Sequence, residues 1–80
     1  MAELLAYLAR ELVDDPDAVR VDTDEREGAL VLVLHVGPDD VGKVIGRGGR
    51  IARALRTLVR ASSVREGRRV LVEIADPDPE

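Results

Sequence analysis

Glycines and basic side chains gather in residues 42–51, which read Gly-Lys-Val-Ile-Gly-Arg-Gly-Gly-Arg-Ile. Glycine places no Cβ between the main chain and a ligand, so a sugar-phosphate strand can approach the backbone closely. Amides at the start of a helix, together with lysine and arginine, are groups that bind phosphate. The stretch therefore predicts an anion site in which Lys43, Arg47 and Arg50 contact phosphate. The glycines that permit the approach are Gly46, Gly48 and Gly49.

Two other phosphate-binding patterns overlap this stretch, and each fails at a position its chemistry needs. Residues 37–43 read G-x-x-x-x-G-K, but Val44 follows where a hydroxyl should ligate Mg²⁺, and Pro38 removes an amide from the cradle. A dinucleotide pattern begins at Gly46, but Ile51 occupies its last glycine position. No cofactor is therefore expected. A plain glycine-rich turn between two helices remains as the structural alternative.

Charge is distributed very unevenly along the chain. The formal net charge is −4, yet residues 43–69 contain a single acid, Glu66, among nine basic residues: Lys43, Arg47, Arg50, Arg53, Arg56, Arg60, Arg65, Arg68 and Arg69. In a helix, with about 100° per residue, Arg53, Arg56 and Arg60 project from one side and Leu55 and Val59 from the other. The pattern favours an anion-binding face, with Arg53 extending its rim. A merely solvated arginine-rich helix is the alternative.

Composition excludes several classes of protein. Eighty residues allow one domain, expected over 1–80 with 76–80 as a frayed acidic tail. Tyr7 is the only aromatic residue, which argues against nucleic-acid recognition on aromatic platforms. The absence of cysteine removes disulfides, thiol chemistry and cysteine-based zinc sites. No apolar stretch approaches the length of a membrane span, and no export signal opens the chain, so we expect a cytoplasmic protein without a membrane partner.

Hydrophobic periodicity and turn residues predict an α+β fold. The expected order is helix, strand, strand, helix, helix, strand, over residues 2–13, 19–23, 29–36, 38–45, 50–62 and 70–74. Glu27-Gly28 should form a turn, and Gly46–Gly49 should break the chain between the fourth and fifth elements. If all helices cover one face of the sheet, Val31 and Val33 form an exposed patch on the other, a candidate dimer surface.

Other polar residues favour structural roles over chemistry. Asp14-Asp15 ends a helical pattern and Asp39-Asp40 begins one, positions where acids act as terminators and as partners of the helix dipole. His35 has no second histidine or cysteine to accompany it, which favours a packed or edge histidine. Neither a metal site nor a catalytic site is predicted. Ile45 and Ile51 flank the glycines, and Tyr7 should border the core.

The run from Gly42 to Arg56 resembles the signature of a K-homology (KH) domain, and the element order is that of the bacterial type II form. More narrowly, the opening Leu-x-x-Leu helix, the corner at residues 12–17 and the length resemble the small bacterial single-KH-domain RNA-binding proteins of the KhpA type. The resemblance implies a three-stranded mixed sheet with three helices on one face. It also implies a G-x-x-G loop that clamps about four single-stranded nucleotides, with Ile45 and Ile51 lining the groove beneath the bases. Ala52 departs from the broad pattern, in which many KH domains have isoleucine, and the difference affects the floor of the groove.

The resemblance further implies a non-enzymatic RNA chaperone or post-transcriptional regulator linked to cell division and envelope growth. Such proteins act as homodimers or pair with a second, larger KH protein. A different class of function is left open by the residues themselves. A protein-interaction module with the KH shape could use the same arginine face on an acidic partner.

Overall fold

The computed structural model describes residues 2–75, apart from the side chains of residues 47–48 and 63–66. In chain order the elements are α1 (Ala2–Leu12), the short 3₁₀ helix η1 (Pro16–Ala18), β1 (Arg20–Arg26), β2 (Ala29–His35), α2 (Pro38–Glu66) and β3 (Val70–Ile74). The predicted α+β class is confirmed, and the order of elements matches the prediction except that one bent helix, α2, replaces the two expected helices and that η1 was not anticipated. The expected acidic tail, residues 76–80, lies outside the described residues.

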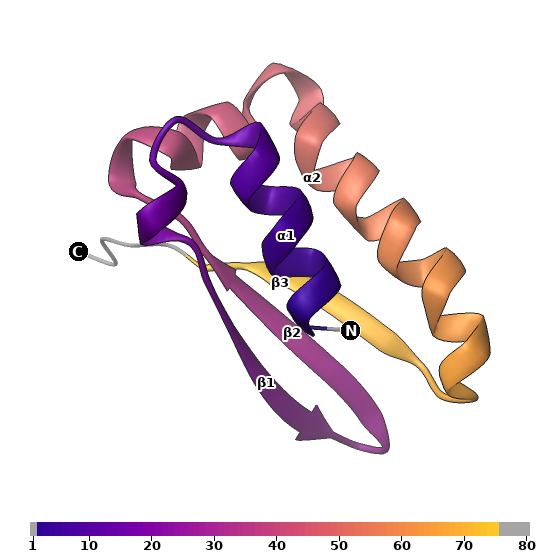
Figure 1. The fold of residues 1–80 in the computed structure, drawn as a ribbon. Coiled ribbons are helices and arrows are strands. Elements are labelled where there is room, and N and C mark those ends of the chain that lie inside the picture. Colours follow the sequence, from indigo (N-terminus) through magenta and orange to yellow (C-terminus); the bar gives the residue numbers. More distant parts are fainter. Residues whose placement is uncertain (1, 76–80) are drawn as a thin grey trace.

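The three strands form one mixed sheet in the order β1-β2-β3, with β1 antiparallel and β3 parallel to the central β2. Glu27 and Gly28 have φ of 52° and 82°, the left-handed pair that a tight hairpin needs, so the predicted turn is confirmed. Parallel strands need a long crossover connection. Here α2 supplies it and lies with α1 on one face of the sheet (Figure 1).

The core fills the space between the helices and the sheet and is entirely aliphatic. Leu5, Leu32, Leu34, Leu55 and Val59 are fully buried there. Tyr7, by contrast, is 60% exposed and stands away from the core that it was expected to border. No helix within residues 2–75 combines the length and apolar character needed to cross a membrane.

Helix α2 differs from the two separate helices that the glycines predict. Its 29 residues form one helical element. Within it Gly49 has a φ of 70°, and the ribbon changes direction between its magenta and orange portions (Figure 1). We call residues 38–48 the first arm and residues 50–66 the second arm. A single left-handed residue bends the helix without needing an open loop. The second arm runs past the expected end at Ser62 and stops at Gly67, whose φ is 72°.

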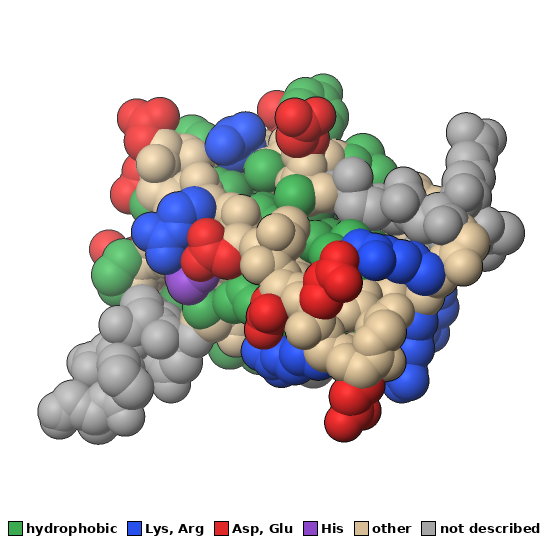
Figure 2. Space-filling model, turned by 90° about the horizontal axis from the view of Figure 1, so that it is seen from below, with side chains coloured by type: hydrophobic (Ala, Val, Ile, Leu, Met, Phe, Trp, Pro, Cys, Tyr) green, Lys and Arg blue, Asp and Glu red, His purple; other side chains and the backbone are tan. Residues whose placement is uncertain are grey.

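The open face of the sheet, opposite the helices, corrects the prediction of an exposed valine patch. Val31 is only 1% exposed, although Val33 is partly accessible. Arg26 on β1 reaches across the central strand to Glu73 on β3, with Arg26 Nη1 3.2 Å from Glu73 Oε2, so its long side chain covers Val31. Acidic and basic side chains are intermixed when the molecule is viewed from below (Figure 2).

Candidate nucleic-acid interface

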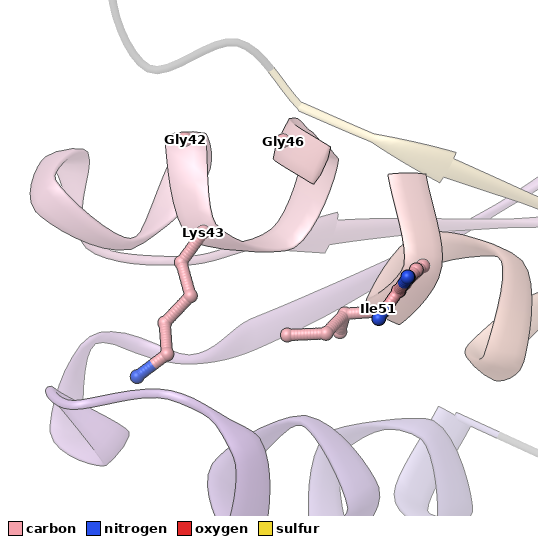
Figure 3. Close-up of a pocket in the computed structure, with 5 residues that line it drawn as sticks. Gly42, Lys43, Gly46 and Ile51 are labelled. Atoms are coloured by element: carbon pink, nitrogen blue, oxygen red, sulfur yellow. The ribbon is translucent and has the colours of Figure 1, made fainter. Parts of the chain in front are cut away.

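The bend of α2 creates a cleft of about 510 Å³ between its two arms, which we call the glycine cleft. Among the described residues it is lined by Gly42, Lys43, Gly46, Arg50 and Ile51. Ile51 extends from the second arm below the first arm, and Lys43 extends from the first arm toward the chain around the end of α1 (Figure 3). Bare backbone, one aliphatic side chain and two cations therefore meet in one hollow.

Gly42 and Gly46 leave open space where a side chain would stand. A Cβ built at either position meets nothing within 4 Å, and neither has a left-handed φ. Glycine in a helix interior costs roughly 1 kcal/mol relative to alanine. Neither packing nor backbone conformation explains that cost, whereas close approach of a ligand does. Gly49 is different, since its φ of 70° strains any residue that carries a Cβ.

Lys43 is already engaged in an ion pair, which its position in the sequence did not reveal. Its Nζ lies 3.0 Å from Oδ1 of Asp14, in the segment that follows α1. The two residues are 29 positions apart, so only the tertiary fold brings them together. Both side chains are accessible to solvent, and exposed pairs of this kind contribute only about 0–1 kcal/mol.

A buried carboxylate holds the segment that carries Asp14. Asp40 is 1% exposed, and its two oxygens accept the backbone N–H groups of Asp14 and Asp15, each at 3.0 Å. The pair Asp39-Asp40 was expected to act as a partner of the helix dipole, so this link between α2 and the end of α1 was missed. The acid pair Asp14-Asp15 is confirmed as a helix terminator, because α1 ends at Leu12.

A second, more open hollow lies along the second arm, beside two of its arginines. Its volume is about 480 Å³, and among the described residues it is lined by Arg50, Arg53, Ala54, Thr57 and Leu58. Arg50 belongs to both hollows and therefore stands between them. Arg56 points elsewhere, since its Nε donates to the carbonyl oxygen of Val72 on β3 at 3.3 Å.

The structure thus brings together part of the predicted site. Lys43, Gly46, Arg50 and Ile51 line the glycine cleft, Gly49 forms the bend, and Arg53 lies beside Arg50 in the second hollow. Ile45 is 50% exposed and is not among the cleft-lining residues. The side chain of Arg47 and the surroundings of Gly48 lie outside the described part of the chain.

Polar and charged side chains on the open face of the sheet are paired with one another. Arg26 lies 3.0 Å from Asp24 and 3.2 Å from Glu73, and His35 lies 2.8 Å from Asp22. The hydrogen bond that Arg26 donates to Asp24, followed by the negative charge of Glu73, raises the pKa of Arg26. His35 is therefore a partly buried histidine of the strand, as its sequence context predicted.

Comparison with known proteins decides the family. The protein-family model described as "KhpA/KhpB, KH domain" matches residues 2–74 of this chain. The chain belongs to this family. A relative from Treponema pallidum, named RNA-binding protein KhpA, is 54% identical over 74 residues, which cover 92% of this chain and 92% of the relative. Proteins of the same name from Caldanaerobacter subterraneus subsp. tengcongensis and Mycobacterium bovis are 50% and 46% identical, covering 92% and 98% of this chain and 99% and 94% of theirs.

A solved structure supports the same fold. A crystal structure of Era from Aquifex aeolicus matches with a TM-score of 0.65 and 20% sequence identity. The match covers 91% of this chain and 28% of that protein. At this identity the likeness concerns the fold alone, and it places the elements of this KH domain in an arrangement already known from experiment.

Proposed function

We propose that this KH domain binds single-stranded RNA by holding the sugar-phosphate backbone in the glycine cleft. The observation that carries the proposal is the bare main chain at Gly42 and Gly46, open to solvent and bordered by Lys43 and Arg50. The name of the relatives, RNA-binding protein, supports RNA as the polyanion. The proposed contact residues are Lys43, Ile45, Gly46, Arg47, Gly48, Gly49, Arg50, Ile51 and Arg53.

Each group has a distinct task in this proposal. The glycines let a phosphate come close to the main chain beside the bend at Gly49. Arg50 offers a planar fork of donors that matches phosphate oxygens, and Lys43 adds a point charge. Ile51 supplies an apolar surface against which a sugar or base can lie.

The same composition favours weak and permissive recognition. With Tyr7 as the only aromatic residue, and that on α1, base stacking contributes little in this domain. Phosphate contacts then dominate the binding free energy, which makes the affinity strongly dependent on salt. Three or four phosphates of a single strand predict a slope of roughly −2 to −3 for log affinity against log salt.

The direct test changes Arg47→Asp and Gly48→Asp together. Two acids beside the bend should repel phosphate and remove one contact, lowering the affinity for a fluorescently labelled single-stranded RNA by about a hundredfold or more. Fluorescence anisotropy measures the affinity. Circular dichroism and thermal melting should stay near wild type, because the nearest described core residues of α2, Val44 and Ala52, lie on either side of the substituted positions.

A matched control carries Arg10→Asp and Thr23→Asp, on exposed positions outside both hollows. This control has the same net charge as the test variant, so any long-range repulsion is shared. If both variants lose affinity equally, or if neither does, the glycine cleft is not the binding site. In the second case the arginine face would be free to serve an acidic protein partner instead.

The resemblance to KhpA-type proteins supports finer proposals about cellular role. We propose that the protein acts in the cytoplasm as an RNA chaperone or post-transcriptional regulator linked to cell division and envelope growth. Pairing, either with itself or with a larger KH protein, would raise the effective affinity of a weak single domain through avidity. Light scattering coupled to size-exclusion chromatography reads out the self-pairing.

A further inference from the structure

The one acid that contacts a lining cation of the glycine cleft, among the described residues, is Asp14, whose Oδ1 lies 3.0 Å from Nζ of Lys43. We propose that Asp14 is a built-in competitor of RNA phosphate for Lys43. It would thereby determine how loosely the cleft holds its ligand. This inference rests on the proposed function, because it concerns the same cleft and the same polyanion.

Hydrogen bonds to Asp40 fix the backbone that carries Asp14. The backbone N–H of Asp14 donates to Oδ1 of Asp40, and the next N–H along the chain donates to the other oxygen of that buried carboxylate. These two hydrogen bonds fix the main chain on which the Asp14 side chain stands. The carboxylate itself stays in solvent, with its side chain 83% exposed. Its position is therefore set, while its ion pair is easy to break.

Lys43 can exchange the carboxylate of Asp14 for a phosphate of the RNA. Its side chain is 44% exposed and lines the cleft, so the ammonium group is accessible to a phosphate. An ammonium has three donors and could contact both anions at once. In that arrangement the carboxylate and the phosphate would repel each other at short range. Whether Asp14 is displaced or retained, its negative charge weakens phosphate binding.

A matched pair of substitutions tests this proposal in the full chain. Asp14→Asn removes the charge that faces Lys43 but keeps the backbone N–H that Asp40 binds. Asp17→Asn, in η1, makes the same change in net charge at an exposed side chain. At low salt, D14N should raise the affinity for a single-stranded RNA oligonucleotide by about two- to fivefold, the size expected for one exposed ion pair. D17N should leave the affinity close to wild type.

Two further measurements isolate the contact. In a Lys43→Gln background the gain from D14N should vanish, because no ammonium remains for the anions to share. Raising the salt concentration should also shrink the gain, because exposed charges are screened. Equal effects of D14N and D17N, a loss of affinity in D14N, or a gain that persists without Lys43 would each overturn the competitor role. If neither the wild type nor any variant binds RNA, the proposed function itself fails. If the wild type binds RNA but the variants give one of the contrary results above, only the competitor role of Asp14 fails.

Discussion

Two regions of this small domain combine arginine or lysine with acidic side chains, and they use them in opposite ways. On the open face of the sheet, Arg26 lies between Asp24 and Glu73 and covers Val31. In the glycine cleft, Lys43 meets one exposed acid, Asp14, and no described acid pairs with Arg50. Arg26 of the open face is therefore held in ion pairs with neighbouring acids, whereas Lys43 and Arg50 of the cleft border an open hollow.

The difference shows why net charge is a poor guide to polyanion binding in this chain. The overall charge of −4 would discourage RNA if it were spread evenly. Instead the acids neutralise the cations of the sheet locally, and the cleft retains the charge that a phosphate can use. Substitutions in the two regions should therefore affect different quantities, RNA affinity in the cleft and folding stability on the open face.

The largest contrast should come from the same substitution made in each region. Arg50→Gln removes a charged donor from the cleft, and we expect the affinity for single-stranded RNA to fall by about tenfold, the size of one charge-assisted hydrogen bond. Arg26→Gln should leave that affinity unchanged but lower the free energy of unfolding by up to about 1 kcal/mol, since it loses exposed ion pairs and the cover over Val31. Fluorescence anisotropy and urea denaturation measure the two quantities, and a loss of affinity in R26Q comparable to that in R50Q would break the comparison.

A smaller effect with a more distinctive sign is expected from Gly46→Ala. Alanine favours helix by about 1 kcal/mol over glycine, and its Cβ meets nothing within 4 Å, so thermal melting should shift upward. The same methyl group stands where the ligand backbone would approach, so RNA affinity should fall by about three- to fivefold, equivalent to roughly 1 kcal/mol. A variant that becomes more stable and keeps its full affinity would show that the cleft does not receive the RNA backbone.

Much of the fold could be predicted because its signals are local. The apolar run at residues 29–36, the Glu27-Gly28 turn and the alternation at residues 70–74 each specify an element through a few neighbouring residues. The glycine and arginine pattern of residues 42–51 likewise placed the candidate site on the bend of α2. Four of the predicted site residues, Lys43, Gly46, Arg50 and Ile51, do line one cleft. Resemblance to KH domains added the arrangement of the sheet.

What could not be predicted depends on contacts between residues far apart in the chain. Asp40 was interpreted through its helix alone, because its hydrogen-bond partners lie 25 and 26 residues away. The pairing of Lys43 with Asp14 was hidden for the same reason. The valine patch was predicted from strand alternation, which carries no information on how far a long side chain such as Arg26 reaches across a strand. The sequence also did not reveal that one left-handed glycine, Gly49, would bend α2 while the helix continues on both sides of it.

The central claim is that RNA meets the molecule at the glycine cleft and not at the open face of the sheet. An NMR titration of the isotope-labelled chain with a short single-stranded RNA tests it residue by residue, and 80 residues are well within reach of the method. We predict that the amide signals of Gly42, Gly46, Arg50 and Ile51 shift progressively, while those of Val31 and Glu73 stay in place. Shifts concentrated on the open face, or no shifts in the cleft at saturating RNA, would contradict the claim.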